Sequence, residues 1–178
     1  MTRRLLPALA LLMALPASAQ HTQAGVQASV VFPQSDLRTN AAGALGLDVG
    51  VHVVLDLQGG SELRPRLDYL QCDTEAFHAI SFSSTTRTVH AVTLGVDYLR
   101  YFDQGNRGLY GVVGVGAQWW SASDAAHGDT HDFNPGISFG AGFRFNSSLA
   151  AEITYNIGKF RSNSGTAGSV QMGLNYRF

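Results

Sequence analysis

The sequence has 178 residues, of which 45% are apolar and 14% are charged, with 20 Gly, one Cys and a formal net charge of -1. This length suits one domain, and the apolar content excludes a globally disordered chain. The single Cys excludes a disulfide scaffold, and the near-zero charge provides no electrostatic footprint for nucleic acid. Soluble domains usually carry about 25% charged residues, and helical membrane proteins contain apolar runs of about 20 residues. With 14% charged residues and no long apolar run after its first residues, the chain fits neither the soluble nor the helical membrane class.

The first 19 residues, MTRRLLPALALLMALPASA, have the order of an export signal. Two Arg precede an apolar stretch that is too short to span a bilayer, and an A-x-A cleavage site ends at Ala19. We therefore expect a signal peptide at residues 1–19 and one domain over residues 20–178. Cys72 lies mid-chain without an intrachain partner, and we interpret it as an unpaired residue at a strand end.

The remaining chain alternates between apolar and small or polar residues with a period of two, which indicates strands whose two faces meet different surroundings. The last strand is the clearest, with apolar residues at every second position up to Phe178. Leu55, in the second segment, falls on the apolar face. In residues 109–120 both faces are apolar, and we assign Val113, Val115 and Trp119 to the outer face. Eight such segments are predicted, at residues 24–32, 45–55, 63–69, 92–98, 109–120, 137–145, 149–158 and 170–178.

The polar face indicates which solvent each face meets. A water-facing strand should carry many long charged residues, yet the chain contains one Lys, Lys159, and this face is rich in Gly, Ser, Thr, Asn and Gln. Small residues fit the crowded interior of a narrow barrel, and the apolar face then meets lipid. Because backbone groups in hydrocarbon must all be paired, the strands must close into a barrel. We therefore predict an all-β, eight-stranded, antiparallel up-and-down transmembrane barrel, with a soluble β-sandwich as the alternative.

The connections alternate in length, as such a barrel requires. Short turns are expected at residues 59–60, 103–106 and 146–148, and longer loops near 33–43, 72–88, 121–134 and 159–167. Aromatic residues gather near the strand ends, where membrane barrels carry girdles. The predicted girdle consists of Phe32, Tyr69, Tyr98, Tyr101, Phe102, Trp119, Trp120 and Phe145.

The final segment, GSVQMGLNYRF, places five apolar residues on one face: Val170, Met172, Leu174, Tyr176 and Phe178. With the signal peptide and the eight alternating segments, this strand resembles the small bacterial outer-membrane β-barrels, namely the OmpA transmembrane domain, OmpX and the opacity-type barrels. The resemblance covers residues 20–178. It implies a location in the outer membrane, contact with lipid and lipopolysaccharide, and recognition of the closing strand by the barrel-insertion machinery. It also implies that no periplasmic wall-binding domain follows Phe178.

The inward face carries four acids and four arginines. Buried charges must be paired to avoid a cost of several kcal/mol each, and an ion-selective pore should show an excess of one sign. We therefore expect a salt-bridged plug, with a narrow ion pathway as the alternative, and we interpret His52 as a satisfied member of this network. The predicted lumen network is Asp48, Arg64, Arg66, Asp68, Asp97, Arg144, Glu152 and Arg177.

Two loops contain residues that could carry chemistry. Residues 121–134 include the metal-capable groups Asp124, His127, Asp129, His131 and Asp132, but a metal site needs three or four rigidly held ligands. We therefore interpret this segment as a polar loop and expect no metal or cofactor. Residues 72–88 carry Phe77, Ile80 and Phe82, which fit either an extension of the strands or an exposed adhesive patch.

Some barrels of this size modify lipid A, using a His and a Ser two residues apart. In this chain no His lies two residues before Ser162, and His78 and Ser81 are three residues apart rather than two. Nucleophilic catalysis needs a base within reach of the hydroxyl, so we expect no enzymatic activity. The predicted role is structural or surface interaction, and the predicted partners include an extracellular ligand of the loops. The alternatives are a low-conductance pore and a lipid A-modifying enzyme.

Overall fold

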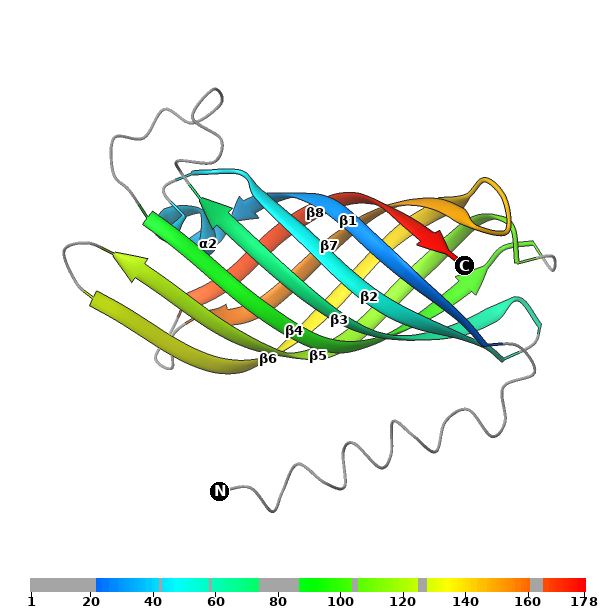
Figure 1. Ribbon diagram of the computed structural model, residues 1–178, viewed down its shortest axis with the longest axis horizontal. Helices are drawn as coiled ribbons and strands as arrows, with labels where there is room; N and C mark the ends of the chain where they lie inside the picture. The colour runs from blue at the N-terminus through cyan, green and yellow to red at the C-terminus, as the bar shows by residue number, and fades with distance from the viewer. Residues whose placement is uncertain are drawn as a thin grey trace, which may run out of the picture.

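The computed structural model describes residues 22–41, 43–57, 59–73, 87–103, 106–124, 128–160 and 165–178 (Figure 1). Residues 1–21 lie outside this range, so the predicted signal peptide is not part of the described structure. Among the described residues, no helix has the length and apolar character needed to cross a membrane.

Eight antiparallel strands form a closed barrel in sequence order, and β1 pairs with β8 to close it. Figure 1 shows that the strands run obliquely to the long axis of the barrel and that β1 and β8 lie side by side. This confirms the predicted fold class. The strands are β1 (Thr22–Gln34), β2 (Gly46–Asp56), β3 (Ser61–Asp73), β4 (Arg87–Tyr101), β5 (Gly108–Asp124), β6 (Gly128–Arg144), β7 (Leu149–Phe160) and β8 (Gly165–Arg177).

The two faces of the barrel wall follow the period-two pattern. On β5, Val113 and Val115 are each 62% exposed on the outside, whereas Asp97 of the neighbouring strand is 1% exposed inside. Leu55 differs from the expectation, because it is 3% exposed although the alternation places it outside. It lies at the end of β2 between its cross-strand partners Thr22 and Leu63.

Short turns join the strands at one end of the barrel, as predicted. Gly59 and Gly60 both have positive φ, at 61° and 75°, a conformation that other residues rarely adopt. In the β6–β7 turn, the Asn146 Oδ1 atom accepts hydrogen bonds from the backbone N–H groups of Ser148 and Leu149, at 2.9 and 2.7 Å. These turns hold each pair of strands in register.

The opposite end contains more regular structure than the sequence pattern indicated. Residues 121–134, expected to be a loop, are largely paired, since β5 reaches Asp124 and β6 begins at Gly128. Beyond the membrane both faces of a hairpin meet water, so alternation is lost while backbone pairing continues. The segment 33–43, also expected to be a loop, contains a short helix, α2 (Ser35–Asn40). Of the 72–88 loop, residues 74–86 lie outside the described structure, including Phe77, His78, Ile80, Ser81 and Phe82.

Candidate functional site in the barrel interior

The inward charges are brought together by strand register. Arg64, Arg66 and Asp68 occupy alternate positions of β3, so all three point inward. Arg64 lies opposite Asp97 of β4, and Asp68 lies opposite Gly50 of β2. Gly50 and Gly114 have no side chain, and a Cβ at either would overlap the carboxylate of Asp68 or of Asp97, respectively. The inward glycines therefore make room for the charged groups.

Arg64 is the centre of the main cluster. Its Nε and Nη2 atoms donate to the Asp97 Oδ2 atom at 3.1 and 2.9 Å, and its Nη2 also donates to the Glu152 Oε2 atom at 2.9 Å. Arg66 adds a second positive charge: its Nε lies 2.9 Å from the Asp97 Oδ2 atom, and its Nη1 contacts the Asp68 carboxylate. Since the guanidinium of Arg64 bridges β4 and β7, this cluster ties together strands from opposite parts of the wall.

A second cluster lies toward the short-turn end, around Glu62. Arg144 donates to both carboxylate oxygens at 2.9 and 3.1 Å, and Arg177 does the same at 3.0 and 2.7 Å. The Tyr101 hydroxyl donates to the same carboxylate at 3.1 Å. All four side chains are buried. Sequence reasoning missed Glu62 because it adjoins the Gly59–Gly60 turn, although extending the alternation of β3 by one step from Arg64 would have found it.

Two tyrosines connect the clusters. Tyr110 donates a hydrogen bond to the Glu152 Oε1 atom at 2.7 Å, and its ring lies 4.9 Å from that of Tyr101. The guanidinium of Arg144 lies 4.7 Å above the Tyr101 ring. Tyr101 is 3% exposed, so its predicted place in the aromatic girdle is wrong. In β4 the even-numbered residues face outward, and Tyr101 therefore faces the lumen.

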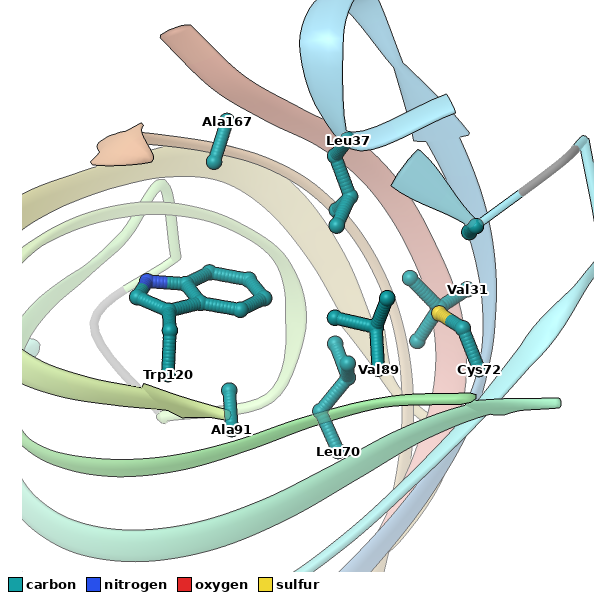
Figure 2. Close-up of a cluster of buried hydrophobic side chains, with 9 residues drawn as sticks. Val31, Leu37, Leu70, Cys72, Val89, Ala91, Trp120 and Ala167 are labelled. Atoms are coloured by element: carbon teal, nitrogen blue, oxygen red, sulfur yellow. The ribbon is translucent and has the colours of Figure 1, made fainter. Parts of the chain in front are cut away.

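The opposite end of the lumen is closed by apolar side chains. Figure 2 shows the indole of Trp120 and the side chain of Leu37, from α2, pointing into the space enclosed by the strands. The Asp36 carboxylate accepts a hydrogen bond from the backbone N–H of Thr166 at 2.7 Å, which attaches α2 to β8. The cluster is formed by Val31, Leu37, Ala41, Leu70, Cys72, Val89, Ala91, Trp120 and Ala167.

Trp120 also differs from the girdle prediction, because it is 6% exposed and lies inside this cluster. Adjacent residues of a strand face opposite sides, so only Trp119 faces outward. The other predicted girdle residues lie on the outside: Phe32 is half-buried, and the remainder are exposed, namely Tyr69, Tyr98, Phe102, Trp119 and Phe145. On the closing strand, Val170 is half-buried and Met172, Leu174, Tyr176 and Phe178 are exposed.

Two predicted interior residues have surroundings that the sequence did not indicate. Asp48 accepts a hydrogen bond from Ser29 at 3.3 Å rather than joining the arginine cluster directly. His52 is buried, yet neither of its ring nitrogens has a hydrogen-bond partner among the described residues, so its expected role as a satisfied network member is wrong. The imidazole ring lies against Gly25 on β1, and a glycine has no side chain that could form a hydrogen bond with it.

The interior retains little free space. The cavities between the charged clusters and the apolar cap measure about 30 and 20 Å³, and about 10–15 Å³ is needed to hold one water molecule. These two cavities accommodate isolated waters and not a water column, so the interior between the Arg64 cluster and the apolar cap is filled mainly by side chains.

The predicted metal-capable segment is described only in part, because the side chains of Asp124 and Asp129 lie outside the described structure. Among the described residues, no three His, Cys, Asp or Glu side chains gather in a geometry that could hold an ion. His131 lies on the outer face of β6, exposed, opposite Ser121 of β5. His127 lies outside the described residues.

Comparison with known proteins identifies the class. Residues 5–178 match the family described as outer membrane protein beta-barrel domain. Neisserial surface protein A is 15% identical over 88% of this chain and 97% of its own, with a TM-score of 0.57. The attachment invasion locus protein Ail of Yersinia pestis is 10% identical over 88% of this chain and 97% of its own, with a TM-score of 0.55. Ail has also been solved with the heparin analogue sucrose octasulfate.

The N-terminal barrel domain of Pseudomonas aeruginosa OprF is 14% identical over 89% of this chain and 100% of its own, with a TM-score of 0.55. No curated protein matches the sequence. Likeness at these identities shows the fold alone, whereas the family match spans nearly the whole chain. Together with the closed barrel and its apolar outer wall, it establishes that this chain belongs to the outer membrane protein beta-barrel domain family and is an integral protein of the outer membrane.

Proposed function

We propose that this protein is a non-conducting barrel that acts at the cell surface, as a structural protein and a display scaffold for its outer segments. The observation that carries the proposal is the filling of the lumen at three levels. The Glu62 cluster closes the short-turn end, the Arg64 cluster closes the middle, and the Trp120 cluster closes the other end.

Planar-bilayer recording tests the closed state. The wild-type protein should produce no single-channel steps. Removing the Trp120 indole alone should leave the barrel silent, because the two charged layers remain below it. Regular wild-type steps that change size in Arg64→Gln would favour the pore instead.

Bacterial barrels have short turns in the periplasm and longer connections outside, so the β5–β6 hairpin extends from the cell surface. Its paired backbone, from Ser121 opposite His131 to Asp124 opposite Gly128, forms a defined surface for an extracellular ligand. That Ail has been solved with a bound sugar derivative supports ligand binding by barrels of this shape.

Lipopolysaccharide is a further partner that we propose for this end of the wall. A hollow of about 540 Å³ there is lined by Trp119 and Phe133, whose rings are 4.9 Å apart, and by His90 and His131. Aromatic faces beside hydrogen-bonding groups suit the boundary between acyl chains and sugar. Trp119→Ala should reduce co-purified lipopolysaccharide, measured per folded barrel, while Phe145→Ala at the opposite end should not.

We also infer that export involves cleavage after Ala19 and that the closing strand guides insertion. N-terminal sequencing of the membrane form should begin at Gln20. We propose no enzymatic activity, and the lipid A of cells that express the protein should have an unchanged mass spectrum. Deacylated or acylated species that depend on the protein would overturn this part of the proposal.

A further inference from the structure

The outer wall has a second hollow, of about 630 Å³, near the short-turn end. Gly111 of β5 and Ala141 of β6 are direct cross-strand partners within its lining. Larger side chains stand around them, among them Tyr98, Val113 and Phe139. Its size lies in the range of small-molecule sites.

Backbone geometry and packing do not require the glycine in this hollow. A Cβ at Gly140, for comparison, would overlap the Ile153 carbonyl oxygen, and Gly108 has a φ of 76°. At Gly111 a Cβ would meet no atom within 4 Å, and its φ lies outside the left-handed region. Glycine weakens a strand interior and leaves a side-chain position empty. Its presence at a lipid-facing position therefore points to something that occupies the space.

A fixed positive charge adjoins the hollow. Arg100 is exposed on the outer face of β4, directly opposite Gly111. Its Nη1 atom donates to the Gly59 carbonyl oxygen and the Ser61 Oγ atom, both at 2.7 Å. The Ser61 hydroxyl is also within 2.9 Å of the Tyr98 hydroxyl. The remaining guanidinium nitrogens have no protein partner within the described structure and can donate to an anion.

We propose that this hollow binds one phospholipid of the periplasmic leaflet, with an acyl chain against Gly111 and Ala141 and its phosphate at Arg100. The apolar lining suits the acyl chain of the phospholipid, and the Arg100 guanidinium is complementary to the phosphate in charge and in hydrogen-bonding geometry. Arg100 lies one residue from the end of β4, close to the level at which headgroups meet the barrel. The inference depends on the membrane location and not on whether the lumen conducts.

Native mass spectrometry of the barrel released from nanodiscs of phosphatidylethanolamine and phosphatidylglycerol tests the proposal. The wild-type barrel should retain one phospholipid. Arg100→Gln removes the charge and should lower the retained fraction about threefold, as expected for loss of a partly exposed charge contact. Gly111→Leu fills the hollow and should lower the retained fraction at least as much.

Matched controls separate this site from general lipid contact. Ala28→Leu enlarges an exposed small residue on β1, and Lys159→Gln removes an exposed cation at the opposite end of the barrel; both should retain phospholipid like the wild type. Heat-modifiable migration verifies that each variant is folded. Equal retention in all five proteins would overturn the proposal. A dimer that Gly111→Leu dissociates would also overturn it, because a second copy would then occupy the hollow.

Discussion

At the scale of single residues, Glu62 balances two buried arginines at once. Arg144 and Arg177 each bind both of its carboxylate oxygens, and all three side chains are at most 5% exposed. Truncating one member of a buried ion pair leaves an uncompensated charge, which costs about 3–5 kcal/mol. The contribution of Glu62 to stability therefore exceeds that of any exposed acid in a turn.

Glu62→Gln should lower the stability of the folded barrel by about 3–5 kcal/mol, because the neutral amide cannot balance either arginine. Urea titration in detergent micelles, followed by heat-modifiable migration, measures the change. Asp103→Asn, at an exposed acid in the β4–β5 turn, is the control and should leave the midpoint unchanged. Equal midpoints for the two variants would contradict the role of Glu62.

His52 should show the opposite behaviour. Its ring nitrogens are buried without protein partners, so replacing the imidazole with an apolar side chain removes an uncompensated desolvation cost of about 1–3 kcal/mol. His52→Leu should therefore raise the urea midpoint. Asn175→Leu should lower it, since the Asn175 Oδ1 atom accepts a hydrogen bond from Arg64 at 3.3 Å. A His52→Leu barrel less stable than the wild type would show that the imidazole has a partner after all.

At the scale of elements, the strands within the membrane could be predicted because lipid on one side and a crowded lumen on the other impose alternation. The paired hairpin above Trp120 and the helix α2 could not be predicted in the same way, since neither lies between two contrasting solvents. For Tyr101 and Trp120, residue type favoured the girdle, whereas their position in the strand placed them inside. Strand parity is thus a better guide to orientation than aromatic character.

The closing strand permits a prediction about assembly. The backbone N–H of Phe178 donates to the Ala24 carbonyl oxygen at 2.9 Å, and its ring lies 5.5 Å from that of Tyr176. Deleting Phe178 removes the hydrogen bond to β1 and the ring contact within the closing strand, and it should slow insertion, measured as the rate at which the heat-modifiable form accumulates in membranes. Phe102→Ala, an exposed aromatic in a turn at the same end, should insert at the normal rate. Normal kinetics after the deletion would contradict a role for Phe178 in assembly.

At the scale of the whole molecule, the barrel has no free sheet edge in its described part, because the ladder runs from β1 to β8 and back to β1. Gly25 lies opposite Arg177, so the first and last strands meet at the short-turn end. Figure 1 shows the C-terminus at the end where β1 begins. Thr22, the first described residue, and Phe178 are therefore close enough to be joined without disturbing a strand.

A circular permutant that joins Phe178 to Thr22 through a short Gly-Ser linker, and opens between Ser147 and Ser148, should refold in detergent micelles. Every strand pair is preserved, since the seam becomes a hairpin and the β6–β7 turn becomes the new termini. Far-UV circular dichroism and heat-modifiable migration measure refolding. A permutant that stays unfolded in micelles would show that the order of strand synthesis, and not only the set of pairs, determines the structure.

The fit between inward glycines and the side chains opposite them has an evolutionary consequence. A Cβ at Gly142 would overlap Tyr110, and one at Gly114 would overlap Asp97 and Ser138. In such a filled lumen, a larger residue on one strand is tolerated only if its neighbour becomes smaller. Homologous barrels should therefore diverge by paired exchanges of volume across strands, so that substitutions at inward positions of neighbouring strands are correlated, whereas outward positions away from the two proposed lipid sites are not tied to a neighbour in this way.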